Sequence, residues 1–199
     1  MMTLHASSPI RLTVIVVAAL IAWLPGGAQL AHAAAGDLDP SFGTGGKVTT
    51  AIGAADDFGI DMAVQSDGKI VVAGWSYNGS NEDFALVRYA TDGSLDPSFG
   101  TGGKVTTDFG GADDHGYSVA LQSDGKIVVA GFSVNYGIDN SNFALVRYAT
   151  DGSLDPSFGT DGKVITDLGA AADQGRSVAL QSDGKIVMAG FSGNFSSTT

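Results

Sequence analysis

Cysteine is absent from the 199 residues, and glutamate occurs only once, at Glu82. Without cysteine the chain can form neither a disulfide framework nor a Cys-ligated metal site. Basic side chains are also scarce, since 10 Lys and Arg stand against 21 Asp and Glu, for a formal net charge of -11. Because this balance cannot neutralise phosphate groups, it excludes a nucleic-acid-binding protein. What the chain does have is aspartate and 29 glycines, which favour turns over helix surfaces and exclude a long-helix bundle or coiled coil.

The first 35 residues have the pattern of a secretory signal peptide. Arg11 precedes thirteen largely apolar residues, Leu12 to Leu24, and small residues up to Ala33 and Ala35 offer two cleavage positions. A membrane anchor would need about 20 apolar residues. We therefore predict a signal-peptide helix that is cleaved, a secreted or cell-surface location, and a mature chain outside the membrane.

The remainder of the chain consists of one sequence unit that is repeated almost three times. The segment L-D-P-S-F-G begins at Leu38, Leu95 and Leu154, with spacings of 57 and 59 residues. The segment Q-S-D-G-K-I-V occurs three times and F-A-L-V-R-Y twice, because the chain ends where its third copy would begin. The predicted organisation is a signal peptide over 1–35 and repeats over 36–93, 94–152 and 153–199, the last without its final strand.

Each unit contains four predicted strands, which in the second repeat are Lys104–Thr107, Ser118–Gln122, Lys126–Phe132 and Phe143–Tyr148. Asp-Gly between the second and third strands is a strong hairpin signal. Stretches such as Ile127–Ala130 are apolar on both faces, whereas a sandwich strand alternates apolar and polar residues. Sheets buried on both faces must stack on neighbouring sheets, as blades do in a β-propeller. The predicted fold is all-β, with propeller-like blades of four antiparallel strands.

These repeated segments resemble the delta-60 repeat, a bacterial repeat assigned to β-propellers, over essentially all of residues 36–199. The resemblance implies a secreted or surface protein of unknown biochemical role and brings no catalytic residues with it. Propellers typically have four to eight blades, whereas this chain encodes about 2.75. It is therefore a fragment of a longer protein, half of a two-chain ring, or an open arc with capped ends. We predict self-association if it is not a fragment.

Two sets of aspartates are candidate ligand sites. Asp57, Asp114 and Asp173 occupy one position in all three repeats, where they form a ring of carboxylates for cations or substrate, or cap the turn into the second strand. Repetition in every blade favours capping. Asp92, Asp96, Asp151 and Asp155 form segments that faintly resemble a calcium loop. They lack the Gly and Glu of an EF-hand, so turn formation between blades is the better account.

His115 is the only histidine after the leader, and without a matched nucleophile we interpret it as an ordinary surface residue rather than part of a catalytic triad. Arg88 and Arg147 lie within apolar strands and need acidic partners. Their nearest candidates are Asp96 and Asp155 respectively.

Ligand contacts are expected in the loops that vary between repeats, which carry Tyr77, Asn78, Tyr136 and Asn140, a composition suited to carbohydrate or protein. We predict an exported, non-catalytic structural or binding module without a cofactor. One alternative is a piece of a secreted propeller hydrolase or lyase with its active site on missing blades. Another is a surface protein stabilised by Ca²⁺.

Overall fold

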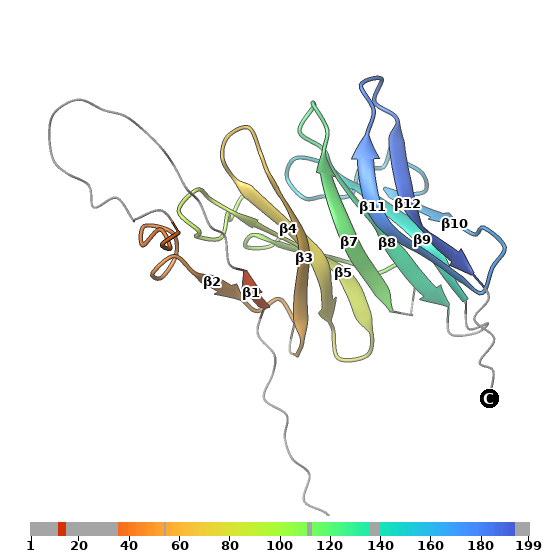
Figure 1. The fold of residues 1–199 in the computed structure, drawn as a ribbon, viewed down its shortest axis with the longest axis horizontal. Coiled ribbons are helices and arrows are strands. Elements are labelled where there is room, and N and C mark those ends of the chain that lie inside the picture. The colour runs from red at the N-terminus through yellow and green to blue at the C-terminus, as the bar shows by residue number, and fades with distance from the viewer. Residues whose placement is uncertain (1–11, 15–35, 54, 111–112, 136–139, 194–199) are drawn as a thin grey trace, which may run out of the picture.

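A computed structural model describes residues 12–14, 36–53, 55–110, 113–135 and 140–193, all as strands, turns and irregular segments (Figure 1). The strands are β1 (Leu12–Val14), β2 (Val48–Thr50), β3 (Asp57–Val64), β4 (Ile70–Tyr77), β5 (Glu82–Tyr89), β6 (Lys104–Thr107), β7 (Asp114–Leu121), β8 (Ile127–Asn135), β9 (Asn140–Tyr148), β10 (Lys163–Thr166), β11 (Ala172–Leu180) and β12 (Ile186–Gly193). These residues include no helix long and apolar enough to cross a membrane.

The strands form blade-like sheets that do not close into a ring. Blade 1 has the order β3-β4-β5-β6, and blade 2 has the order β7-β8-β9-β10, with antiparallel pairing throughout. Blade 3 is the hairpin β11-β12, joined to blade 2 by a single parallel pair, Ala172 and Ser141. The predicted all-β architecture with four-stranded blades is therefore confirmed.

Each complete blade crosses a boundary between sequence repeats. Its first three strands come from one repeat, but its outer strand comes from the next, so β6 of the second repeat pairs with β5 of the first. β2 is the equivalent of β6, and it pairs with β1, three residues of the predicted leader. The other residues of the leader and its cleavage positions lie outside the described residues.

β2 lies against blade 1 as β6 lies against blade 2. The Tyr89 hydroxyl of blade 1 donates to Thr50 Oγ1 of β2 over 2.7 Å, and the Tyr148 hydroxyl of blade 2 is 2.8 Å from Thr107 Oγ1 of β6. Burial raises the pKa of both tyrosines. The segment carrying β2 thus occupies the place of an outer strand from a preceding blade.

Both faces of a central strand are buried, as the apolar runs predict. Val71 and Ala73 of β4 belong to a cluster shared with blade 2, whereas Ile70 and Val72 pack with Phe42 on the opposite face. The hairpin before β4 is closed by Gln65 N donating to Lys69 O over 2.8 Å. Gly68 in that turn has a φ of 84°, which few other residues adopt without strain.

Apolar residues on the outward faces of the two outermost blades are exposed, unlike the equivalent residues between blades. Val71, Val128 and Val187 are equivalent residues of three blades; the first two are 0% exposed, whereas Val187 is 47% exposed. At the other end Val64 of β3 is 60% exposed. The two outermost blade faces therefore present apolar side chains to solvent.

Candidate functional site

The structure brings the two groups of predicted binding residues to one edge of the blades. Asp57 begins β3 and Tyr77 ends β4, and the Tyr77 amide donates to Asp56 O over 3.1 Å. The equivalent contact in blade 2 joins Val134 N to Asp113 O over 2.9 Å. We call this the loop edge: the starts of β3, β7 and β11 with the β4–β5 and β8–β9 loops. Tyr136 of the second loop lies outside the described residues.

The three equivalent aspartates are buried caps of the turns that precede β3, β7 and β11. Asp57, Asp114 and Asp173 are 2%, 0% and 0% exposed. Each accepts a backbone hydrogen bond at Oδ2: from Ile52 over 2.9 Å, Phe109 over 2.7 Å and Leu168 over 2.7 Å, respectively. This is the arrangement expected of the capping interpretation. They do not form an open ring of carboxylates facing solvent.

The turns between blades use the aspartates that resemble a calcium loop. Asp92 Oδ1 accepts hydrogen bonds from the Ser94 amide over 2.9 Å and the Ser94 hydroxyl over 2.6 Å, and Asp151 binds Ser153 in the same way. Asp96 Oδ2 is 2.8 Å from Arg88 Nε and 3.2 Å from Lys69 Nζ. Asp155 has the equivalent contacts. These carboxylates therefore already have hydrogen-bond or ion-pair partners within the fold.

The predicted Arg–Asp pairs are confirmed. Arg88 Nε donates to Asp96 Oδ2 over 2.8 Å, and Arg147 Nε donates to Asp155 Oδ2 over the same distance. The pKa of Asp96 lies well below the ordinary carboxyl range, chiefly because the Ser98 hydroxyl donates to it, with Arg88 and Lys69 adding to the effect. Asp155 is shifted in the same direction by its own serine and basic neighbours.

The loop residues largely bind their own loop. Asn78 Nδ2 donates to Asn81 Oδ1 over 2.6 Å and to Asp83 Oδ2 over 2.8 Å, while Asn78 Oδ1 accepts from the Ser80 amide over 2.8 Å. Tyr77 and Asn140 are half-buried. Asn78 thus fixes the conformation of the β4–β5 loop and holds one oxygen of Asp83.

Asp83 belongs to an acidic group that the sequence interpretation missed. One carboxylate oxygen each from Asp83, Asp108 and Asp114 lie within 4.8 Å of one another, at the junction of blades 1 and 2. Burial raises the pKa of Asp114 to about 6, and the charges of Asp108 and Asp83 add to the rise. Burial also raises the pKa of Asp83. Asp108 and Asp114 are only six residues apart, but Asp83 lies on a different strand, so the stacking of two blades is needed to complete the group.

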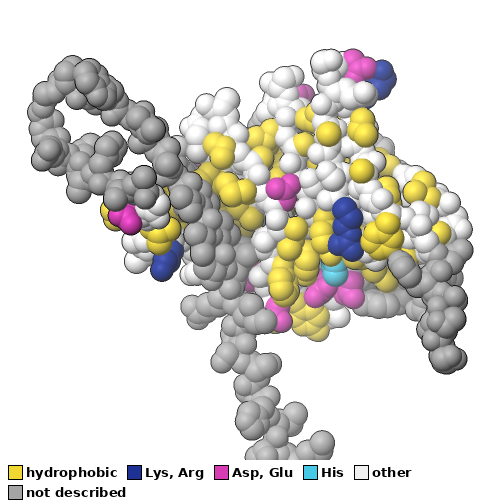
Figure 2. Space-filling model, in the orientation of Figure 1, with side chains coloured by type: hydrophobic (Ala, Val, Ile, Leu, Met, Phe, Trp, Pro, Cys, Tyr) yellow, Lys and Arg dark blue, Asp and Glu magenta, His cyan; other side chains and the backbone are white. Residues whose placement is uncertain are grey.

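Aromatic rings form a second unpredicted feature, a row across the inner strands of the three blades. Phe58 and Trp75 have ring centroids 5.0 Å apart, and Trp75 stacks on His115 at 4.5 Å with an interplanar angle of 10°. Beyond them the Arg176 guanidinium lies 4.0 Å above the Tyr117 ring. Figure 2 shows this face, with hydrophobic side chains around a basic group and the histidine.

His115 is therefore not the isolated surface residue that the sequence suggested. Its ring lies between Trp75 and Phe132, Nε2 contacts Glu82 Oε2, and its side chain is only 18% exposed. The corresponding residues of the other repeats are Phe58 and Gln174. The one sequence signal was Phe58, an aromatic ring at the equivalent position of the first repeat.

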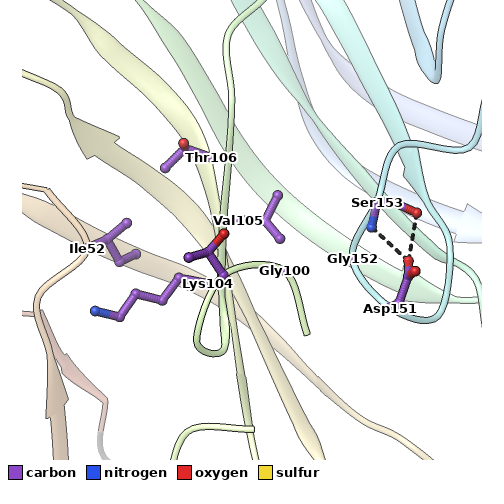
Figure 3. Close-up of a pocket in the computed structure, with 9 residues that line it drawn as sticks. Ile52, Gly100, Lys104, Val105, Thr106, Asp151, Gly152 and Ser153 are labelled. Carbon is purple, nitrogen blue, oxygen red and sulfur yellow. Dashed lines mark hydrogen bonds between the residues drawn. The ribbon is translucent and has the colours of Figure 1, made fainter. Parts of the chain in front are cut away.

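The outer rim has a shallow groove of about 650 Å³ beside β6 (Figure 3). Its lining includes Lys104, whose Nζ donates to Ala51 O over 2.7 Å, and Asp151, which is held by Ser153. These polar groups have partners in the fold, and the groove contains no convergent set of titratable groups. It is a surface depression between blades.

Two segments of the chain, residues 65–99 and 122–158, match a family described as "Domain of unknown function (DUF5122) beta-propeller". Each segment runs from the hairpin before the third predicted strand through F-A-L-V-R-Y to the next L-D-P-S-F motif. The match identifies these repeats as β-propeller-type. No curated protein matches the chain.

Proposed function

We propose that this chain is an exported, non-catalytic part of a β-propeller, built from delta-60 repeats and completed by further blades of the same kind. The observation that carries the proposal is the exposure of Val187, at 47%, where Val71 and Val128 are 0% exposed. In blades 1 and 2 the neighbouring structure covers the equivalent residue. An exposed apolar residue at this position of blade 3 therefore indicates a face that binds a further blade. β2 gives independent support, because it lies against blade 1 in the position that β6 of blade 1 has against blade 2.

The surroundings of His115 support a non-catalytic role. A general base needs a ring nitrogen within reach of the proton it removes. Here Glu82 engages Nε2, and Nδ1 is buried. The aromatic neighbours on both sides hold the ring as a packing element between blades 1 and 2. An enzyme in the complete ring would need its catalytic groups on other blades.

Ligand binding, as a second part of the proposal, belongs at the loop edge. Tyr77 and Asn140, both half-buried, lie there, at the ends of strands whose connecting loops differ in length between repeats. A carbohydrate or a protein surface is the ligand class that suits tyrosine and asparagine. Replacing both Tyr77 and Tyr136 with alanine should abolish retention on a glycan or surface-protein array. Unchanged retention would contradict this part alone.

The blade-completion proposal is tested by the mass of the purified chain in solution. Light scattering should give a mass above that of one chain, because a second copy supplies the missing cover, or aggregation at low concentration. Val187→Asp should reduce association, since it places a charge on the exposed end face. Ser182→Asp, in the exposed turn before β12, is the matched control and should not.

A monodisperse monomer that unfolds cooperatively, with the same midpoint in the Val187→Asp variant, would overturn blade completion. Export is tested separately, by the N-terminal sequence of the protein recovered outside the cell. That sequence should begin after Ala33 or Ala35.

A further inference from the structure

The acidic group at the junction of blades 1 and 2 combines residues from three separate segments. Asp83 lies on β5 of blade 1, Asp108 directly follows β6, and Asp114 begins β7 of blade 2. Asp83 and Asp114 are 6% and 0% exposed, whereas Asp108 is exposed. The group therefore has two buried carboxylates and one at the solvent boundary.

Two oxygens of this group have no hydrogen-bond partner. Asp83 Oδ2 accepts from Asn78 and Asp114 Oδ2 accepts from the Phe109 amide, but Oδ1 of both residues is buried and has no partner with hydrogen-bond geometry. The nearby Ser133 side chain lowers the pKa of Asp114 and only partly offsets its burial. Within the described part of the chain, no Lys, Arg or His lies within 4 Å of either carboxylate. Buried carboxylate oxygens without a partner are costly, so this group calls for a component that compensates them.

The next junction repeats this pattern at equivalent positions. Asn142 corresponds to Asp83, Asp167 to Asp108, and Asp173 to Asp114. Asn142 Oδ1 and Asp173 Oδ1 are again buried without a hydrogen-bond partner. The same two unpartnered oxygens thus recur where the next two blades meet. The difference is chemical: the second junction has a neutral amide where the first has a carboxylate.

We propose that the junction of blades 1 and 2 binds one hard divalent cation of the Ca²⁺ class through Asp83, Asp108 and Asp114. Carboxylate oxygens are the ligands such cations prefer, at about 2.4 Å, so two ligands on opposite sides of the ion lie about 4.8 Å apart. The spread of this group is within that limit. Asp108 provides access from solvent, and water completes the coordination.

Such an ion joins two blades. Asp83 belongs to blade 1 and Asp114 to blade 2, so a shared cation converts repulsion between their carboxylates into attraction across the junction. The site is distinct from the Asp92 and Asp151 turns, where sequence similarity to a calcium loop pointed. The site lies at the loop edge, because Asp114 begins β7 and Asn78 binds Asp83, but it does not use Tyr77 or Asn140.

The test uses the full chain with Tb³⁺ as a luminescent probe and Ca²⁺ as competitor. Trp75, next to the cross-strand partner of Asp83, should sensitise bound Tb³⁺. We expect saturable emission that Ca²⁺ abolishes, and a thermal unfolding midpoint that Ca²⁺ raises and a chelator lowers. Trp75→Phe should remove the emission without removing the Ca²⁺-dependent shift.

Reciprocal variants at the two junctions assign the site. Asp83→Asn gives the first junction the donor set of the second, and should weaken Ca²⁺ binding by at least roughly tenfold because one charged ligand is lost. Asp167→Asn, at the second junction, is the matched control and should leave binding unchanged. Asn142→Asp should add a second site, visible as a second equivalent of bound Tb³⁺.

Absence of Tb³⁺ binding in the parent chain, with a midpoint indifferent to Ca²⁺ and chelator, would overturn the proposal. So would a stabilising effect of Asp83→Asn in chelator and in Ca²⁺ alike, since that result means Asp83 and Asp114 share a proton instead. If Asp83→Asn does not fold, the chelator series and Asn142→Asp still decide the question.

Discussion

The junction between blades 1 and 2 differs from the free face of blade 3, although the same repeat builds both. Contacts between residues close in sequence are duplicated: Arg88–Asp96 and Arg147–Asp155 have equal Nε–Oδ2 distances of 2.8 Å. One contact of Arg88 with the following blade is not duplicated. Arg88 Nη1 also donates to Thr150 O in the turn after β9, whereas no such bond to a following blade is described for Arg147.

The repeated sequence therefore determines the structure within a blade, whereas the adjacent blade determines how deeply the residues of that blade are buried. The side chain of Arg88 is 6% exposed and that of Arg147 is 17% exposed. The cost of any substitution should therefore depend on how many blades cover the residue. Substitutions at equivalent positions measure this dependence directly.

The largest effect is expected for the two arginines. Arg88→Met should destabilise the chain by about 3 kcal/mol, because it leaves buried Asp96 without its main partner. Arg147→Met should cost only about 1 kcal/mol, since the pair is nearer to solvent. The free energy of unfolding in urea measures both. Equal losses would show that the next blade adds nothing to the arginine site.

Acid should weaken the Arg88–Asp96 and Arg147–Asp155 sites alike, because equivalent contacts lower the pKa values of Asp96 and Asp155. A carboxyl with a lowered folded-state pKa binds protons more readily when unfolded, so its stabilisation is present above the ordinary carboxyl pKa, near 4. It is lost as the pH falls below that value. Asp96→Asn and Asp155→Asn should each flatten the acid limb of a plot of unfolding midpoint against pH. A change seen only in the Asp96→Asn variant would show that the repeated local contacts do not determine the acid sensitivity.

The smallest effect is expected in the turn before the outer strand. Asp161 has a φ of 50° where the equivalent Gly102 has 60°, and the left-handed region is costly for a residue with a Cβ. Asp161→Gly should therefore stabilise the chain by roughly 0.5 kcal/mol. Gly102→Asp should destabilise it by a similar amount. Thermal unfolding of both variants checks the pair, and a loss of stability on Asp161→Gly would refute the strain.

Much of the fold was predictable because it is local. Asp-Gly turns, β-branched strands and runs apolar on both faces indicate stacked four-stranded sheets, and the repeat length indicates a blade. The Arg88–Asp96 pair was predictable for the same reason, since its members are only eight residues apart. The sharing of an outer strand between repeats was not, because local strand propensity does not say which neighbour a strand pairs with.

The candidate sites were likewise predictable where their contacts are local and unpredictable where two blades form them. The caps at Asp57, Asp114 and Asp173 follow from turn chemistry repeated in every unit. The row of rings through Trp75 and His115 involves two blades, and sequence periodicity does not show that residues 40 positions apart stack. His115 therefore had the pattern of a lone surface residue until its neighbours were placed.

The sequence alone determined the repeat, its turns, its strands and its acidic character, since hydrogen bonding, backbone preference and apolar patterning act over a few residues. Only the tertiary structure decided which carboxylates meet and which apolar faces remain uncovered. Both depend on how one blade lies on the next, over separations that no local preference controls. That is why Asp83 and Asp114 form a pair at the junction of blades 1 and 2, and why Val187 is exposed where Val128 is buried.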